Sequence, residues 1–171
     1  CEERKTIMFN WLKNQKESLN PLSSTQQGSL PPPNFEEVAK GQWVVMNGKT
    51  AASDKTSSLF AELITLEDLK VFKTKSGSWN PNNGNQVVKE ETCLVKITNN
   101  IQLNKLRQIG VKYGQTYLVY IKHGNPELVP CIMGKKHTKL KKIQKITENI
   151  TTLKKHQFWI YLKNGVGGVL K

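Results

Sequence analysis

GKKHTKLKKIQKITENITTLKKHQFWIYLK, residues 134–163, combines many lysines with regularly spaced apolar residues. Its eight lysines up to residue 155 are Lys135, Lys136, Lys139, Lys141, Lys142, Lys145, Lys154 and Lys155, and Glu148 is the only acid among them. Apolar residues recur at Leu140, Ile143, Ile146 or Thr147, Ile150 and Leu153. This is the spacing of one face of a helix. We therefore predict a basic amphipathic helix that buries its isoleucine stripe and exposes its lysines.

A lysine face of this kind is most often simply solvated. The charge distribution of the rest of the chain favours a polyanionic partner instead. The net charge is +13. Residues 1–69 carry seven basic and nine acidic side chains, whereas residues 70–171 carry nineteen basic and four acidic ones. Such an uneven field indicates a partner rather than a fold. Phosphate backbones are the commonest such partner, followed by anionic membrane surfaces.

The length of 171 residues suits one domain with a tail, or two small modules. No run approaches the roughly 18 apolar residues that a membrane span needs, and the opening residues CEERKT do not suggest a secretory signal. The three cysteines are odd in number and widely spaced, which is typical of a reducing compartment. We expect a cytoplasmic protein, in the host cytoplasm if it is viral, with the nucleus left open.

The order of patterns divides the chain into four regions. These are an N-terminal helix (1–19), a Pro- and Ser-rich linker (20–34), a β-barrel core (35–134), and the basic helix with an apolar segment (135–171). Strands are predicted at 42–46, 71–75, 93–97, 117–121 and 128–133, a helix at 101–109, a flexible turn at 76–85, an apolar segment at 158–162 and a frayed glycine-rich end. Residues 59–64 read as a strand, or 63–72 as a short helix. The fold class is therefore mainly β with helices: a small barrel, OB-like or similar, with a tethered N-terminal helix.

No catalytic set can be assembled from the sequence. His123, His137 and His156 lack the neighbouring Cys or acid that metal ligation requires. Cys131 follows a proline inside an apolar run, as a small core residue does. The glycines at 165–168 lack the lysine and serine of a phosphate-binding loop. We predict a binding protein with no cofactor and no metal, and not an enzyme.

Aromatic residues and lysines alternate through the middle of the chain. Single-strand binders need this combination, because bases stack on aromatic rings while cations follow the phosphates. About half of these aromatics are expected to be core residues instead, and Trp79, between Ser, Gly, Asn and Pro, has the weakest claim to burial. The predicted nucleic-acid-binding residues are Trp79, Lys73, Lys75, Lys112, Tyr120, Lys122, Lys135, Lys136, Lys139, Lys142 and Lys145. RNA is favoured over DNA.

Three stretches also carry a resemblance: SLFAELITLEDLKVFKTKSGSW (58–79), ETCLVKITN (91–99) and KYGQTYLVYIKHGNPELVPCIMGKK (112–136). Their order resembles the ninth non-structural protein of coronaviruses and related nidoviruses. The matching residues are Leu63, Leu66, Asp68, Leu69, Lys70, Phe72, Lys73, Ser76, Gly77, Cys93, Tyr117, Tyr120, Ile121, Lys122, Gly124 and Asn125. Gln27-Gly28 would also suit cleavage by a viral main protease.

The resemblance implies a small β-barrel that binds single-stranded RNA, dimerises through its C-terminal helix and serves a viral replicase. The chain departs from that family in its lysine-rich helix, which replaces a glycine motif, and in its N-terminus, so neither dimer contacts nor covalent chemistry is transferred. Further candidate partners are other replicase or ribonucleoprotein subunits and a second copy. Two alternatives stay open: a structural protein of a larger ribonucleoprotein without autonomous binding, and a basic module on an anionic membrane surface.

Overall fold

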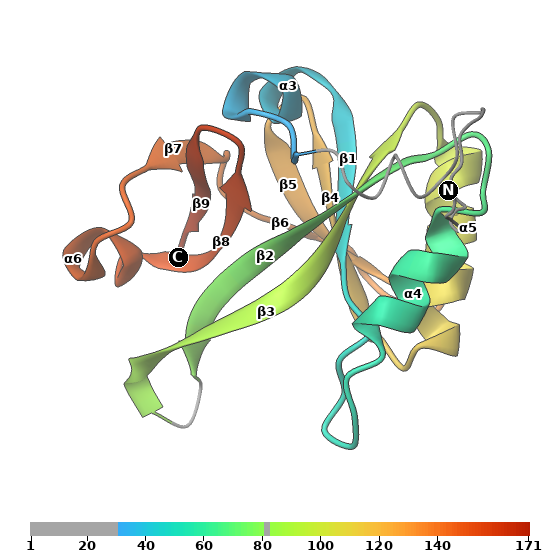
Figure 1. Cartoon of the computed structure of the whole chain (residues 1–171), viewed down its shortest axis with the longest axis horizontal. Coiled ribbons are helices and arrows are strands. Elements are labelled where there is room, and N and C mark those ends of the chain that lie inside the picture. The colour runs from blue at the N-terminus through green and yellow to red at the C-terminus, as the bar shows by residue number, and fades with distance from the viewer. Residues whose placement is uncertain (1–30, 81–82) are drawn as a thin grey trace, which may run out of the picture. The chain divides into compact units, whose positions relative to one another are not determined.

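In the computed structural model, nine strands of the described residues form one curled antiparallel sheet, in the order β6-β5-β4-β1-β3-β2-β8-β9-β7 (Figure 1). The description covers residues 31–80 and 83–171, with side chains for all of these except 79, 80 and 83–87. All belong to one compact unit, Pro31–Lys171. The predicted N-terminal helix, most of the linker and the Gln27-Gly28 site lie outside the described residues.

The strands and helices alternate as follows along the chain. The strands are β1 (Gln42–Met46), β2 (Lys70–Asn80), β3 (Asn83–Ile97), β4 (Tyr117–Lys122), β5 (Asn125–Pro130), β6 (Thr138–Lys139), β7 (Gln144–Ile146), β8 (His156–Leu162) and β9 (Gly165–Leu170). The helices are α3 (Phe35–Lys40), α4 (Thr56–Leu63), α5 (Asn100–Lys112) and α6 (Ile150–Leu153). The coarse prediction of a mainly β protein is confirmed.

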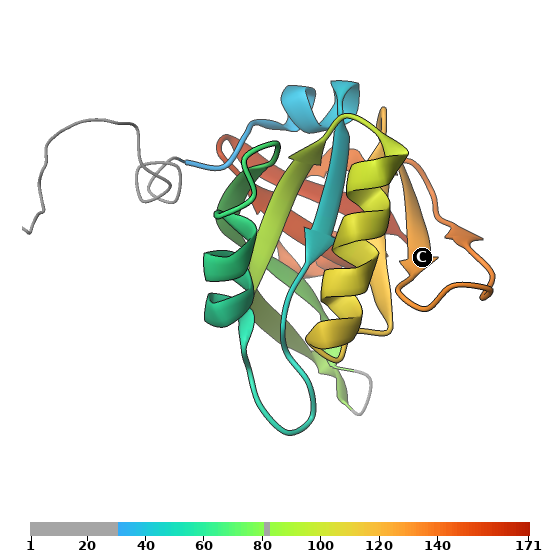
Figure 2. The same cartoon turned by 90° about the vertical axis from the view of Figure 1, so that its right-hand side faces the viewer.

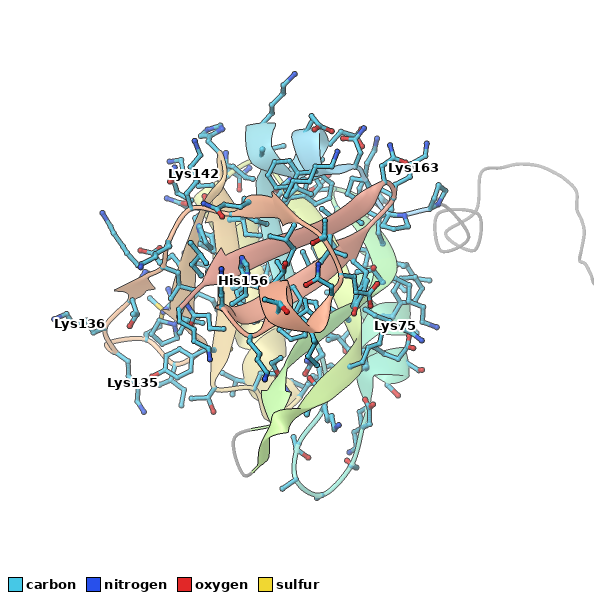
Figure 3. All side chains as sticks on the ribbon, turned by 90° about the vertical axis from the view of Figure 1, so that its left-hand side faces the viewer. Lys75, Lys135, Lys136, Lys142, His156 and Lys163 are labelled. Carbon is cyan, nitrogen blue, oxygen red and sulfur yellow. The ribbon has the colours of Figure 1, made fainter. Side chains whose placement is uncertain are left out.

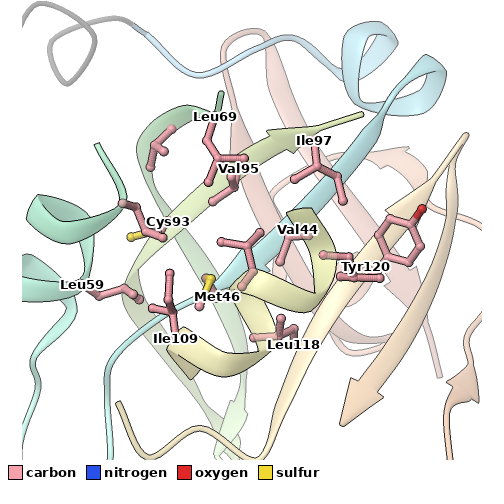
Figure 4. Packing of buried hydrophobic residues seen from close by; sticks show 14 of the residues in the cluster. Val44, Met46, Leu59, Leu69, Cys93, Val95, Ile97, Ile109, Leu118 and Tyr120 are labelled. Carbon is pink, nitrogen blue, oxygen red and sulfur yellow. The ribbon is translucent and has the colours of Figure 1, made fainter. Parts of the chain in front are cut away.

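The central strands are buried on both faces of the sheet, because apolar residues occupy consecutive positions. Along β1, Val44 and Met46 pack under α4 and α5, whereas Trp43 and Val45 point into the concave side. Figure 2 shows α4 and α5 against the same face, and Figure 4 shows the cluster beneath them, including Leu59, Val95 and Ile109. The concave side is filled by Val38, Trp43, Val45, Leu94, Ile121, Ile143, Ile160, Leu162 and Val169.

The segment 138–146, which we call the seam, connects the two edges of the sheet. β6 pairs with β5, and only four residues later β7 begins its pairing with β9. Between them, the Leu140 amide donates to the Pro126 carbonyl and the Ile143 amide to the Gly124 carbonyl. The seam therefore ties the first edge strand to the last, and Ile143, which is 3% exposed, closes the concave core.

The predicted basic helix over 135–155 is wrong. Apart from the one turn of α6, this stretch is extended, in β6, β7 and their connections. A helix would bring lysines together at i,i+3 and i,i+4, for instance Lys141 with Lys145, and like charges at these spacings destabilise helices. The β-branched Ile and Thr residues also favour strands, and the backbone hydrogen bonds to two sheet edges decide the outcome.

The predicted flexible turn and frayed end are also wrong in large part. The residues SGSWN belong to β2, which pairs with β3 throughout and with β8 at Ser76–Ser78. The glycine-rich end forms β9. Glycines in both segments leave room for large neighbours: a Cβ on Gly167 of β9 would lie 2.9 Å from Ile143 Cδ1, and one on Gly77 of β2 would lie 2.2 Å from the Trp159 indole nitrogen.

Several local predictions are confirmed. Strands form at 42–46 and 117–121, and a helix covers 101–109. The apolar segment 158–162, for which no strand was predicted, belongs to β8. Residues 59–64 belong mostly to α4 rather than to a strand, and no helix begins at Thr65, where a turn leads into β2. The face of α4 that carries Leu59 and Leu63 is completely buried in the core, so burial does not distinguish the two patterns in so short an apolar run.

The seam gives a matched pair of substitutions for testing this architecture. Ile143→Asp should lower the free energy of unfolding by about 3 kcal/mol or more, because it buries an unpaired charge. Ile150→Asp, at a residue 55% exposed, should change it by less than about 0.5 kcal/mol. Urea unfolding of both variants measures the difference. Equal loss of stability would favour the helix predicted from the sequence, whose stripe contains both residues.

Candidate nucleic-acid interface

The seam and the residues before it carry six exposed lysines. Lys135, Lys136, Lys139, Lys141, Lys142 and Lys145 are all exposed. No carboxylate in the described part of the chain lies within ion-pair distance of any of them. Figure 3 shows Lys142, Lys135 and Lys136 along one margin of the molecule, with Lys75 on the opposite side. These cations are therefore free for an external anion.

A groove with a volume of about 490 Å³ lies beside the seam, at the turn between β4 and β5. It is lined by Tyr120, Lys122, His123, Asn125, Pro126, Glu127, Lys139 and Leu140. The sheet register explains five of these residues, Tyr120, Lys122, Asn125, Glu127 and Lys139. Lys122 pairs with Asn125, and Glu127 lies between Tyr120 on one side and Lys139 on the other. Alternation along each strand then turns these side chains to one face.

The β4–β5 turn is held tightly against its surroundings. His123 and Gly124 adopt positive φ angles of 50° and 84°, which a tight turn requires. The His123 amide donates to the Gly41 carbonyl, and its Nδ1 lies 2.8 Å from the Lys40 carbonyl oxygen. Lys142 Cε lies 3.6 Å from the position of a Cβ on Gly124. The turn thus brings Lys142 close to the groove.

Tyr120 supports the groove from below. Its ring packs in the core under α5, its hydroxyl donates to Gln42 Oε1 at 2.6 Å, and it is 7% exposed. Burial, together with the charge of Glu127, raises the pKa of this phenol. The ring therefore offers little open surface on which a base could stack.

The other predicted site residues lie elsewhere on the sheet. Lys73 Nζ lies 5.3 Å from the centre of the Phe60 ring, and Lys75 forms an ion pair of 3.8 Å with Glu91. Lys112 Nζ donates to Glu62 Oε1 at 2.9 Å. Trp79 is the second-last residue of β2 and lies opposite Val87, but its side chain lies outside the described residues. Their role in binding stays a prediction.

The structure thus brings together Tyr120, Lys122 and Lys139 in one groove, with Lys142 beside it. Three residues that line the groove, His123, Asn125 and Glu127, were not predicted as binding residues from the sequence. One signal was available for them: a tight His123-Gly124 turn brings Lys122 and Asn125 opposite each other, and strand alternation then adds Tyr120 and Glu127. Lys139 gave no such signal, because its pairing with Glu127 depends on the seam.

Other chemistry finds little support in the described residues. They contain no group of three or more His, Cys, Asp or Glu residues placed to hold a metal ion. None of their helices is long and apolar enough to cross a membrane. Burial raises the pKa of Cys93 to about 12 and also raises that of Cys131, so both thiols stay protonated near neutral pH, where the thiolate is the reactive form.

The pairing of Lys112 with Glu62 predicts a pH-dependent contribution to stability. Hydrogen bonds from Lys112 and Tyr113 lower the pKa of Glu62 below its ordinary value of 4.5. The stabilisation is therefore fully present above that value and is lost as the pH falls through the folded-state pKa. Glu62→Gln should be slightly less stable than the parent at pH 7, and the difference should shrink as the pH falls below 4.5 and through the lowered folded-state pKa of Glu62. Urea unfolding across this range is the measurement. A difference that persists in acid would contradict the ion pair.

No protein-family model matches the sequence, and no curated protein matches it either. The most distinctive features of the chain are the lysines of 135–145, which pair with no carboxylate of the described residues, and the groove at the β4–β5 turn.

Proposed function

We propose that this protein binds single-stranded nucleic acid, RNA in preference to DNA, along the lysines of 135–145 and the groove beside them. One observation carries the proposal: six exposed lysines, none of them paired with a carboxylate of residues 31–80 or 83–171, follow a single stretch whose seam part is hydrogen-bonded to β5 and β9. A solvated lysine face needs no such arrangement. A phosphate backbone, in contrast, is recognised by a row of cations.

The fixed backbone favours binding. The seam is already ordered by its pairing with β5 and β9, so a bound strand would restrict mainly lysine side chains and would not have to order a loop. Each phosphate contact with a single strand releases about 0.7 counterions. If all six lysines contact phosphates, the logarithm of the affinity should fall with that of the salt concentration with a slope of about −4.

The proposal includes the finer parts of the sequence interpretation. These are an OB-like character of the curled sheet, a place in a viral replication complex in the host cytoplasm, and contacts with other replicase or ribonucleoprotein subunits. The resemblance to the ninth non-structural protein of nidoviruses supports them. The C-terminal helix that the resemblance would use for dimerisation has no counterpart here, because β8 and β9 occupy that part of the chain.

Two double substitutions with the same change in net charge test the proposal. Lys139→Gln/Lys142→Gln should weaken binding to an RNA of about 12 nucleotides and flatten the salt slope by about 1.4, because two phosphate contacts are lost. Binding to different sequences should weaken by similar factors, since phosphate contacts carry no sequence information. The control, Lys49→Gln/Lys105→Gln, changes exposed lysines away from the groove and should keep the slope. Fluorescence anisotropy over a salt series measures both.

The outcomes separate the candidate functions. Equal weakening by both variants would mean that the general positive field binds the strand and that the seam has no special role. If the unchanged protein bound no oligonucleotide at low salt, the alternative of a structural ribonucleoprotein component would be favoured. Binding to vesicles of anionic lipid but not to RNA would favour the membrane-surface alternative. Thermal melting of each variant shows whether folding is retained.

A further inference from the structure

Glu127 is out of place in a groove built only for phosphates. Residues 92–171 contain fifteen basic side chains and two acids, Glu127 and Glu148. Glu148 lies outside the groove, where it accepts from the Tyr161 hydroxyl at 2.7 Å and lies 3.9 Å from Lys89. Glu127 lies inside the groove, opposite Lys139 in the strand register. Because a carboxylate repels phosphate, its presence there points to a different group of the ligand.

The remaining lining suits the base of a nucleotide. Leu140 is half-buried and provides apolar surface, and Pro126 and Tyr120 are buried next to it. Asn125 and His123 provide polar groups at the turn. Lys122 and Lys139 supply the positive charge that a phosphate would contact. The volume of about 490 Å³ lies within the range of about 300–1,000 Å³ usual for small-molecule sites. One nucleotide therefore fits the groove in both size and chemistry.

Glu127 retains acceptor capacity for such a ligand. Its Oε1 lies 3.4 Å from His137 Nδ1, a long contact at the rim. An ionised carboxylate has two oxygens and about four acceptor positions, so Oε2 and the free positions of Oε1 can still accept. Its side chain is 26% exposed, which leaves it open to a ligand but partly shielded from water.

We propose that this groove holds one base of the bound strand and that Glu127 selects guanine. The inference rests on the proposed function. On its Watson–Crick edge guanine carries two adjacent donors, N1–H and the N2 amino group, which match the two oxygens of a carboxylate. Adenine and cytosine present an amino donor next to a ring-nitrogen acceptor, and uracil presents a single N3–H between two carbonyl oxygens. Each of these three bases would set an acceptor against the carboxylate.

The test compares a short oligouridylate with the same strand carrying one central guanosine. The protein should bind the guanosine strand about tenfold more tightly, the lower part of the range for one bidentate base contact. In Glu127→Gln this preference should disappear, while affinity for the all-uridine strand stays the same or rises, because a repulsive charge has been removed. Glu148→Gln, the control at the other acid, should keep the preference. In the unchanged protein, guanosine monophosphate should shift the amide resonances of Asn125 and Glu127 more than uridine monophosphate does.

The failures are distinguishable. Equal binding of both strands by the unchanged protein, or a guanosine preference that survives in Glu127→Gln, would overturn the groove assignment and leave the proposed function standing. Absence of binding to either strand would overturn both. A Glu127→Gln variant that melts like the parent rules out misfolding as the cause of a lost preference.

Discussion

The seam, residues 138–146, is the constraint on which the rest of the structure depends. It hydrogen-bonds to β5 at one end and to β9 at the other, and these are the strands next to the two edges of the sheet. Lys139 at the end of β6 and Gln144 at the start of β7 are five residues apart, so they cannot be separated by more than about 18 Å even when the chain is fully extended. The two edges must therefore approach each other, and the sheet must curl. Ile143 packs into the concave core that results. The same segment therefore closes the sheet and completes the concave core.

Close backbone approach makes this closure geometrically possible. The glycines of β9 lie against the seam, so that Ile143 and Ile146 can reach the sheet where side chains would otherwise block them. Where β2 pairs with β8, Gly77 leaves space for the indole of Trp159, which lies opposite it. Trp159 is completely buried in a cluster with Leu153 and Val166. The groove at the β4–β5 turn depends on this closure, since Lys139 and Leu140 reach it only as part of the seam.

Elements that depend on residues close together in the sequence could be predicted, whereas elements that depend on distant residues could not. Local patterns were enough for β1, β4 and α5, where β-branched residues or helical spacing agree with the burial observed. They failed for 135–155, because apolar residues three apart are compatible with a helix and also with a segment that pairs with β5 at one end and with β9 at the other. Only the long-range pairing distinguishes the two. The same limit applies to the site: Lys122 and Tyr120 were identified from their strand, whereas Glu127 could be recognised as a site residue only when Lys139 was known to lie opposite it.

The lysines of 135–145 allow a structural interpretation as well as the proposed function. Lysines on edge strands prevent pairing with other chains, and Lys139 and Lys145 lie in the edge strands β6 and β7. Edge protection does not account for Lys135, Lys136, Lys141 and Lys142, which lie outside any strand. Their mutual repulsion opposes a compact state, and it acts on the very segment that closes the sheet. A bound polyanion would remove that repulsion and stabilise the folded chain by mass action. Closure of the sheet and binding of a phosphate backbone are then coupled through the same side chains, an arrangement that edge protection alone does not require.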